Sequence, residues 1–468
     1  MSETSIKKNF AYKSALTIST YLMSFITFPY VSRVLGVDGI GLVSFVDNTI
    51  NYFLLFATMG INLIGVREIA AVRNDRDKCN QIFSNILGLN LLFTLATLAI
   101  YVVCICFIPQ FYQYKEMFYI GASKILFTTF LVEWFFTGLE NFRYITIRSL
   151  LIKALYVIAV FVWVRSHGDY KLYFTLTVGV VVVNAFINMV YVRNFVKLRF
   201  RAMFSLNFIK QNLILGIYSI MTSMYLTFNV MYLGFVSDNT EVGYYTTAFK
   251  LYSVILGFFT AFTNVMLPRM SALLADGEQE KFRLLVNKSF SMMSIFSIPL
   301  ILCSMILAPQ IIYVLSGSGY EGAILPMRII MPAVLFVGIA QVLAVQILMP
   351  LKKDKVLLCA SVLGAFVSII LNLSLVYFWK SIGSAIVLIC AEFVVTSCYI
   401  GYLKFKSLIQ ISFGKLLYGL LFAIPCLLIV VLCDHVISNP FLCVTIALAA
   451  MLLYFMIIHK ILMKQLRL

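Results

Sequence analysis

Charged residues are scarce in this chain of 468 residues, and acidic side chains are scarcer than basic ones. Asp, Glu, Lys and Arg make up 12% of the sequence, with 19 acidic against 36 basic side chains, whereas hydrophobic residues make up 62%. The mean hydropathy is +0.98. A chain with so few charges cannot cover itself with a water-soluble surface. We therefore expect an integral membrane protein.

Motifs of metal, nucleotide and nucleophilic chemistry are also missing. The ten cysteines show no CxxC spacing and the three histidines share no ligand spacing. No GxxxxGK[ST] loop or nucleophile elbow occurs, and no loop is long enough to fold as a separate soluble domain. A membrane enzyme that joins lipid-linked glycans would need a large loop or a concentrated catalytic constellation. We expect neither a cofactor nor enzyme activity.

Long apolar runs are what the chain has in abundance. Each is about 20 residues or longer, enough to cross a hydrocarbon core of about 30 Å as a helix. The predicted fold class is an all-α polytopic membrane protein with fourteen transmembrane helices. Their approximate spans are 12–34, 40–66, 83–108, 115–137, 147–165, 170–194, 209–236, 242–268, 287–308, 323–349, 356–378, 382–403, 413–433 and 440–461.

Basic residues set the expected orientation. If the N-terminus is cytoplasmic, 28 of the 36 Lys and Arg residues lie on the cytoplasmic side of the predicted spans. Such a bias predicts that both termini are cytoplasmic. The net charge of +17 then reflects topology, and we expect no nucleic acid as a partner.

An internal repeat divides the chain. A shift of 202 residues places Gly41 on Gly243 and Arg67 on Arg269 without a gap. Because six spans separate the copies, both have the same orientation in the membrane, which is a parallel repeat. We expect two pseudo-symmetric six-helix lobes, residues 1–204 and 205–408, with two extra helices in residues 409–468. This is a transporter architecture with its substrate site between the lobes.

Polar stripes mark the helix faces expected to line that site. They recur at helical spacing on the second and eighth predicted spans and superpose under the same shift. Their members are Asp47, Asn51, Thr58 and Asn62, and then Lys250, Ser253, Thr260 and Asn264. Small polar residues also allow close helix packing, which is the alternative interpretation. Charges at depth favour a hydrated cavity.

Basic side chains inside the spans are the candidate substrate ligands. At 1.5 Å per residue, Lys124 and Lys250 lie about 12–14 Å inside their spans. The other three lie nearer span ends, where snorkelling to the headgroups is the alternative. The full candidate set is Arg33, Lys124, Lys153, Lys250 and Arg328.

Acidic side chains at depth are fewer: Asp47, Glu133 and Glu392. They are candidates either for binding a coupling ion, H⁺ or Na⁺, or for neutralising a nearby lysine. An unpaired charge in hydrocarbon costs several kcal/mol, so the cationic surplus predicts an anionic passenger. A polyprenyl diphosphate fits, since Lys supplies a point charge and Arg a fork for phosphate oxygens.

Three segments carry a family resemblance: FPYVSRVLGVDGIG (28–41), MGINLIGVREIA (59–70) and EWFFTGLENFRYITIRSLLIK (133–153). They resemble the bacterial Wzx-type polysaccharide flippases of the multidrug/oligosaccharidyl-lipid/polysaccharide exporter superfamily. The resemblance implies a flippase in the bacterial inner membrane. It would move oligosaccharide repeat units, such as O-antigen, on undecaprenyl diphosphate from the cytoplasmic to the periplasmic leaflet. Alternating access coupled to an ion gradient is implied as well. Implied partners are this lipid-linked glycan, membrane lipids, polysaccharide polymerase and glycosyltransferases.

The same resemblance places the family's basic residue after Pro-Tyr on Arg33 and its eighth-helix lysine on Lys250. Its Trp-Phe-x-x-Gly-x-Glu motif falls on a predicted cytoplasmic helix end, where it could serve loop structure. That motif comprises Trp134, Phe135, Gly138 and Glu140. A lipid II flippase remains an alternative. So does a multidrug or cation antiporter of the superfamily, although its cavity should be richer in carboxylates.

Overall fold

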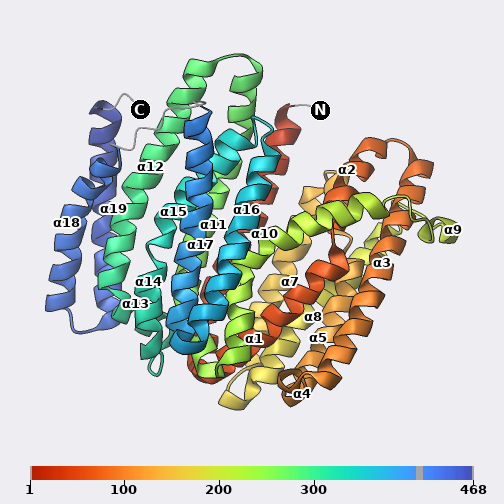
Figure 1. Cartoon of the computed structure of the whole chain (residues 1–468), viewed down its shortest axis with the longest axis horizontal. Coiled ribbons are helices and arrows are strands. Elements are labelled where there is room, and N and C mark those ends of the chain that lie inside the picture. The colour runs from red at the N-terminus through yellow and green to blue at the C-terminus, as the bar shows by residue number, and fades with distance from the viewer. Residues whose placement is uncertain (1–2, 407–414, 466–468) are drawn as a thin grey trace. The chain divides into compact units, whose positions relative to one another are not determined.

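The computed structural model describes residues 3–406 and 415–465, and every regular element in those ranges is a helix (Figure 1). Within the described residues, nine helices are long and apolar enough to cross a membrane. A bent pair, Glu321–Ile330 and Ala333–Leu348, turns by 42° and would be a tenth. The all-α, multiply spanning class is confirmed. The count of fourteen spans stays a prediction, because several of these helices are broken or fused.

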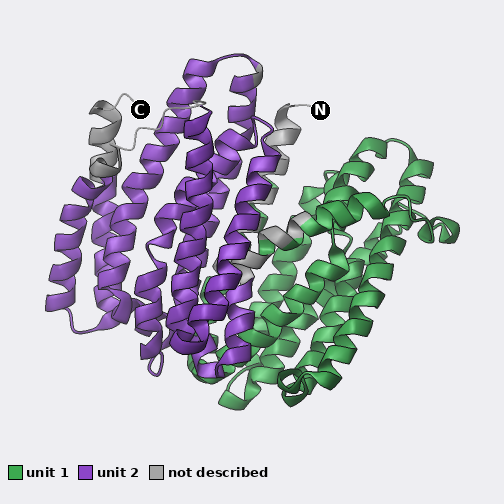
Figure 2. Ribbon diagram, viewed as in Figure 1, with its two compact units in different colours: residues 1–227 green, residues 228–468 purple. Residues whose placement is uncertain are grey.

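The chain forms two compact units, residues 1–227 and 228–468 (Figure 2). Their boundary lies inside helix α10 (Ile209–Val236), whereas the repeat places it at residue 204. The first part of α10 belongs to unit 1 because glycines let the backbones approach closely. A Cβ on Gly216 would lie 2.6 Å from the sulfur of Met59. The predicted lobe limits stay a prediction.

Unit 1 is built from helices with several breaks. At Gly36, α1 changes direction with a φ of 70°, a left-handed conformation that glycine adopts without a steric penalty. Asp75 begins α3 by accepting the N–H of Lys78 at 3.1 Å, and this bond holds the pKa of Asp75 below its usual value. The other elements are α1 (Glu3–Thr58), α2 (Ile61–Val72), α3 (Arg76–Phe107), α4 (Pro109–Gln113), α5 (Lys115–Thr128), η1 (Thr129–Leu131), α6 (Glu133–Gly138), α7 (Phe142–Trp163), η2 (His167–Asp169), α8 (Tyr170–Val192) and α9 (Phe200–Met203).

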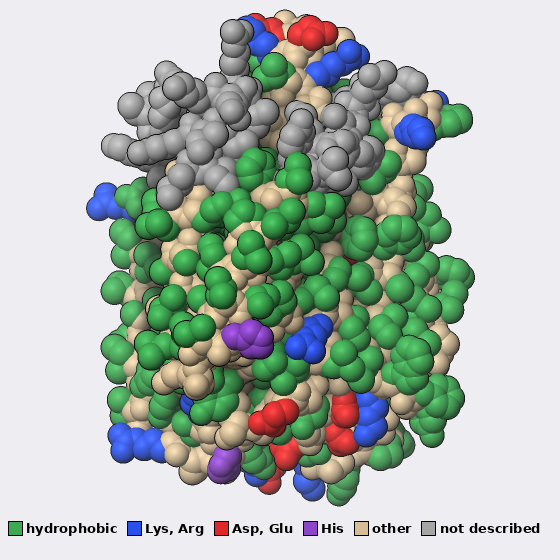
Figure 3. Space-filling view, turned by 90° about the vertical axis from the view of Figure 1, so that its left-hand side faces the viewer, with side chains coloured by type: hydrophobic (Ala, Val, Ile, Leu, Met, Phe, Trp, Pro, Cys, Tyr) green, Lys and Arg blue, Asp and Glu red, His purple; other side chains and the backbone are tan. Residues whose placement is uncertain are grey.

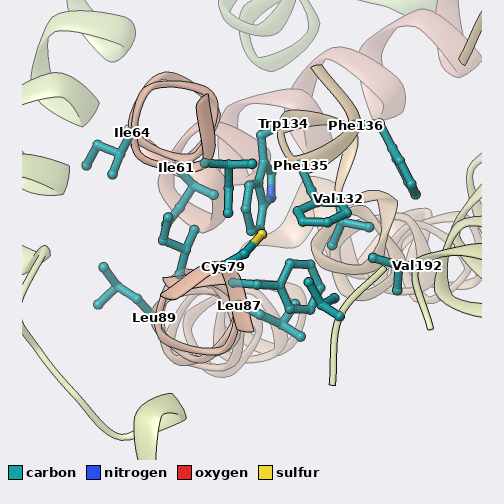
Figure 4. Close-up of a cluster of buried hydrophobic side chains, with 14 of the residues drawn as sticks. Ile61, Ile64, Cys79, Leu87, Leu89, Val132, Trp134, Phe135, Phe136 and Val192 are labelled. Carbon is teal, nitrogen blue, oxygen red and sulfur yellow. The ribbon is translucent and has the colours of Figure 1, made fainter. Parts of the chain in front are cut away.

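A buried aromatic cluster holds α2, α3 and α6 together in unit 1 (Figure 4). The Phe83 ring lies 5.5 Å from that of Trp134 and 5.0 Å from that of Phe135. Each large aromatic side chain buries roughly 150–250 Å². This cluster fixes the short helix α6, which carries the candidate site residue Glu133.

Unit 2 contains two π-helical segments, η4 and η5. Such segments are rare and occur frequently at functional sites. Its elements are α11 (Asn239–Ala275), α12 (Gln279–Ile306), α13 (Ala308–Ser316), η3 (Glu321–Ala323), α14 (Ile324–Ile330), α15 (Ala333–Gln341), η4 (Val342–Leu348), α16 (Asp354–Leu371), η5 (Asn372–Val376), α17 (Tyr377–Phe405), α18 (Lys415–Val436) and α19 (Pro440–Gln465).

Apolar side chains also cover the outside of unit 2. Figure 3 shows the face on the side of α18 and α19, where hydrophobic side chains fill the middle and charged ones gather mostly near the two ends. Leu428 and Leu432 of α18 and Leu452 of α19 are 62–63% exposed. A belt of exposed apolar side chains is what a lipid-facing surface requires.

One predicted span, 40–66, differs from the observed helices. Span 40–66 runs across the turn at Met59 and Gly60, where α1 ends and the separate helix α2 begins. The predicted boundary between spans 356–378 and 382–403, by contrast, agrees with the structure, because the helical path of the apolar stretch Asp354–Phe405 is interrupted at Lys380 with a φ of 44°. Apolar composition does not locate the turn at Met59 and Gly60, because the residues on both sides of it are apolar.

Candidate functional site

Lys124, Asp47 and Asn51 form a polar triad inside unit 1. The Nζ of Lys124, on α5, lies 2.6 Å from Oδ1 of Asp47 and 3.0 Å from Oδ1 of Asn51, both on α1. Asn51 also donates to Asp47 at 3.3 Å. The lysine side chain is 15% exposed and the aspartate 34%. The predicted stripe and the predicted deep lysine thus meet, and Asp47 neutralises Lys124.

Glu133 enters a second ion pair because the chain breaks just before it. Val132 has a φ of 39°, a left-handed conformation that is strained for a β-branched residue, and α6 begins at Glu133. The break directs the Glu133 carboxylate to Arg148 of α7 at 2.5 Å. The Arg148 side chain is only 4% exposed, whereas that of Glu133 is 46% exposed.

Arg148 is a residue that sequence reasoning missed as a site candidate. Its guanidinium also donates to Asn188 of α8, which in turn donates to the Leu131 carbonyl beside the break. Tyr144 donates to Asn188 at 2.9 Å, and the guanidinium lies 5.6 Å from the centre of its ring. Its position inside an apolar run could have revealed it, but Arg148 was counted among the cytoplasmic basic residues instead.

Lys153 lies at the middle of a spanning helix. It is the twelfth of 22 residues of α7, about 16 Å from the start of the helix. Its Nζ donates to Thr20 at 2.6 Å and to Ser19 at 3.4 Å, and both hydroxyls donate onward to the Leu16 carbonyl. No described carboxylate lies within 4 Å of this ammonium group. Two neutral acceptors orient its charge but do not neutralise it.

Two predicted arginines bind backbone carbonyls near helix ends. Arg33 donates to the Pro29 carbonyl at 2.5 Å, just before the break at Gly36. Arg328, on α14, donates to the Met305 carbonyl at 3.0 Å in the last turn of α12. Cations at helix C-termini are stabilised by the unsatisfied carbonyls and the helix dipole. Both side chains are exposed, so snorkelling stays open for each.

The polar stripe of α11 bonds largely to its own helix. Ser253 donates to the Lys250 carbonyl at 2.7 Å, and Thr260 donates to the Leu256 carbonyl at 2.9 Å. Thr58 makes the matching bond to Leu54 in unit 1, at 2.7 Å. Their hydroxyls are thus satisfied without a ligand.

Asn62 and Asn264, the last residues of the two stripes, lie in different local structures. Asn62 is exposed on α2, beyond the turn that ends α1, so it is separated from Asp47 and Asn51. Asn264 is exposed on the uninterrupted helix α11, where Lys250 lies about 16 Å from the first residue. The stripes that superpose in sequence therefore differ in local structure.

Glu392 is buried in the core of unit 2. This residue of α17 is 1% exposed, and its Oε1 accepts a hydrogen bond from the Tyr252 hydroxyl of α11 at 3.0 Å. In the described part of the chain, no Lys or Arg forms an ion pair with it. Its environment thus differs from that of Asp47 and Glu133, each of which contacts a cation.

A neutral network surrounds Asn229 in the same unit. Asn372, at the start of η5, donates to Asn229 Oδ1 at 2.7 Å, and Ser368 donates to it at 3.4 Å. Asn229 donates to the Tyr245 hydroxyl at 3.2 Å and to the Ser384 carbonyl at 3.4 Å. These side chains are almost fully buried, so the network ties α10, α11, α16 and α17 together.

Known proteins place the chain in a family. Residues 6–274, more than half of the chain, match a family model described as polysaccharide biosynthesis protein. The chain belongs to this family. The "Putative O-antigen transporter" of Escherichia coli (strain K12) is 24% identical over 419 residues, which cover 86% of this chain and 98% of that protein. The same-named protein of Shigella dysenteriae is 25% identical over 83% of this chain and 97% of its own length.

Solved structures of two transporters share the fold. The lipid II flippase MurJ, in an inward closed conformation, has a TM-score of 0.80 and 15% identity, covering 98% of this chain and 100% of MurJ. An inward-facing multidrug resistance MATE family transporter has a TM-score of 0.59 and 13% identity, covering 85% and 94%. The family match agrees with the expected resemblance to polysaccharide flippases, and these transporters share the chain's fold.

The motif that carried the resemblance serves the structure of this family member. Trp134 and Phe135 are 3% and 0% exposed in the cluster of Figure 4. Gly138 packs against Ile69 of α2, and Glu140 forms an ion pair with Arg73 at 2.9 Å. These contacts hold the short helix α6 and the break before Glu133 in place.

Proposed function

We propose that this family member is a flippase for oligosaccharide repeat units linked to undecaprenyl diphosphate. It moves them from the cytoplasmic to the periplasmic leaflet of the bacterial inner membrane by alternating access, with both termini in the cytoplasm. The family match and the O-antigen transporter relatives support a lipid-linked glycan as the passenger. Polysaccharide polymerase and glycosyltransferases are the expected functional partners.

The surroundings of the Lys153 side chain are the single observation that carries this proposal. Its ammonium group belongs to the middle of α7, a helix long and apolar enough to span a membrane, and contacts two neutral hydroxyls. A cation in hydrocarbon is costly unless an anion approaches it. A diphosphate supplies several acceptor oxygens and negative charge. Lys124, Lys250, Arg33 and Arg328 stay proposed ligands of the same passenger.

The flippase assay tests this role directly. Wild-type protein in proteoliposomes should translocate a fluorescent undecaprenyl-diphosphate oligosaccharide, and Lys153→Gln should lower the rate at least about tenfold, since bonds to charged groups contribute about 1.5–3 kcal/mol. Arg165→Gln, which loses a contact of its Nε with the Val162 carbonyl at the far end of the same helix, is the matched control and should stay within about twofold of wild type. Unchanged transport by Lys153→Gln would return this lysine to a packing role. Translocation of lipid II alone would favour the alternative substrate.

We further propose that Glu392 binds the coupling ion, and that this ion is H⁺. Asp47 and Glu133 form ion pairs, so the neutralisation of Lys124 and Arg148 is sufficient to explain these two carboxylates. Glu392 instead contacts a neutral phenol in the core, where a protonated carboxyl is tolerated and an isolated carboxylate is costly.

An imposed pH gradient tests the coupling. It should accelerate wild-type transport, and the permanently neutral Glu392→Gln should lose that acceleration while keeping slow equilibration of the passenger. Glu280→Gln, at an exposed position at the start of α12, is the control and should respond as wild type. Transport by Glu392→Gln that still follows the pH gradient, or wild-type transport that follows only a Na⁺ gradient, would contradict the assignment.

A further inference from the structure

The connection between α8 and α10 exposes aromatic side chains next to basic ones. Residues 197–201, Lys-Leu-Arg-Phe-Arg, alternate basic and apolar types. Phe200 is 73% exposed and Phe204 85%, while Leu206 is 54% exposed. Exposed phenylalanines in water are unfavourable, because burying such a side chain is among the strongest stabilising contributions. We call residues 197–206 the α9 segment.

Helix α3 holds the α9 segment in one position. The backbone N–H of Lys197 donates to Asn80 Oδ1 at 2.8 Å, and that of Arg199 donates to Ser84 Oγ at 2.8 Å. Asn80 and Ser84 are buried polar residues, 6% and 0% exposed. The Arg199 side chain also forms an ion pair with Asp77. The exposed rings are therefore presented by a fixed backbone.

A glycine one turn farther along α3 completes this attachment. A Cβ on Gly88 would lie 2.0 Å from the Met203 carbonyl oxygen, so only glycine allows the contact seen here. Asp77, Asn80, Ser84 and Gly88 follow one another along one side of α3, and Gly88 lies about 18 Å from its first residue. The predicted membrane span 83–108 begins next to Ser84, on this side of α3. The segment thus lies where α3 enters the hydrocarbon.

We propose that the α9 segment is an interfacial anchor that binds anionic phospholipid headgroups. Phe200 and Phe204 lie among the headgroups and the upper acyl chains, and Lys197 and Arg201 contact the lipid phosphates. Both basic side chains are exposed, and neither forms an ion pair within the described residues. Basic and aromatic side chains at this depth match the charge and the polarity of an anionic membrane surface. The inference requires only that the chain spans a bilayer, whatever it transports.

Fluorescence quenching tests the position of the rings. The full chain would be placed in nanodiscs of phosphatidylglycerol and phosphatidylcholine brominated near the top of the acyl chains, without polyprenyl lipid. Phe204→Trp adds a fourth tryptophan to the three native ones, and the fluorescence that this tryptophan contributes should be quenched by at least half. Glu278→Trp, in the exposed α11–α12 connection, is the control and should stay bright. Equal brightness of the two variants would overturn the anchor.

Lipid retention tests the headgroup preference. Native mass spectrometry should show bound phosphatidylglycerol on the wild type, and Lys197→Gln with Arg201→Gln should lower its retention about tenfold, as expected for two surface cations. The matched double variant Lys353→Gln with Lys355→Gln also removes two positive charges, and it should retain phosphatidylglycerol as wild type does. Equal losses in both double variants, or quenching without any headgroup preference, would also overturn the proposal.

Discussion

The two units bury polar groups in different ways. Unit 1 places two ion pairs inside its helices, Lys124 with Asp47 and Arg148 with Glu133. Unit 2 buries a neutral network around Asn229 and a carboxyl, Glu392, whose contact is a tyrosine hydroxyl. Ion pairs keep charge available at depth, whereas neutral networks fix helix positions without charge. The proposed function assigns Lys124 and Lys153 of unit 1 and Lys250 of unit 2 to the anionic passenger, and Glu392 of unit 2 to the proton.

Removing the arginine of the buried pair should produce the largest effect on stability. Arg148→Met leaves Asn188 and Glu133 without their cationic partner. Breaking a fully buried ion pair costs about 3–5 kcal/mol. Because the Glu133 side chain is 46% exposed, we expect about 2–4 kcal/mol here. Denaturant unfolding in detergent measures the loss, and the exposed Arg143→Met on the same helix should stay within about 0.5 kcal/mol of wild type.

The neutral network of unit 2 should be less sensitive. Asn229→Leu removes the acceptor of Asn372 and the donor to Tyr245, and leaving buried polar groups unsatisfied costs about 1–3 kcal/mol. Asn229→Leu with Asn372→Leu should recover part of that loss, because both partners are then apolar. The same unfolding assay compares the single and double variants. A loss larger than that of Arg148→Met would remove the contrast between the units.

Sequence reasoning predicted the all-α membrane class of the fold, but not which helices face each other. Helical spacing placed Asp47 and Asn51 on one face of a helix, and the structure brings Lys124 to both, so the alternative that Asp47 neutralises a lysine is what the structure shows. The partner is 77 residues away, a distance over which spacing carries no information. Arg148 was missed for the same reason. Its burial depends on Glu133, which reaches it only because the chain breaks at the strained Val132.

Turns inside apolar stretches were also out of reach. The break at Met59 and Gly60 removes Asn62 from its stripe, although Thr58 and Thr260 keep the same local hydrogen bond in both units. Close backbone approach between Gly60 and α10 positions that break. Such a contact is made by tertiary packing, so the hydrophobic pattern of either segment does not reveal it.

The smallest expected effect is also the sharpest test of the comparison: the same Glu-to-Gln change in each unit. Glu133→Gln keeps a hydrogen bond to Arg148 but removes its counter-charge, so we expect a loss of about 1 kcal/mol. Glu392→Gln should change stability by less than about 0.5 kcal/mol, because a neutral carboxyl gives way to an amide that can still accept from Tyr252. A gain in stability above about 1 kcal/mol for Glu392→Gln at pH 7 would mean that a costly buried carboxylate had been removed. Glu392 would then be ionised at that pH, and its role in unit 2 would be the binding of a metal cation rather than a proton.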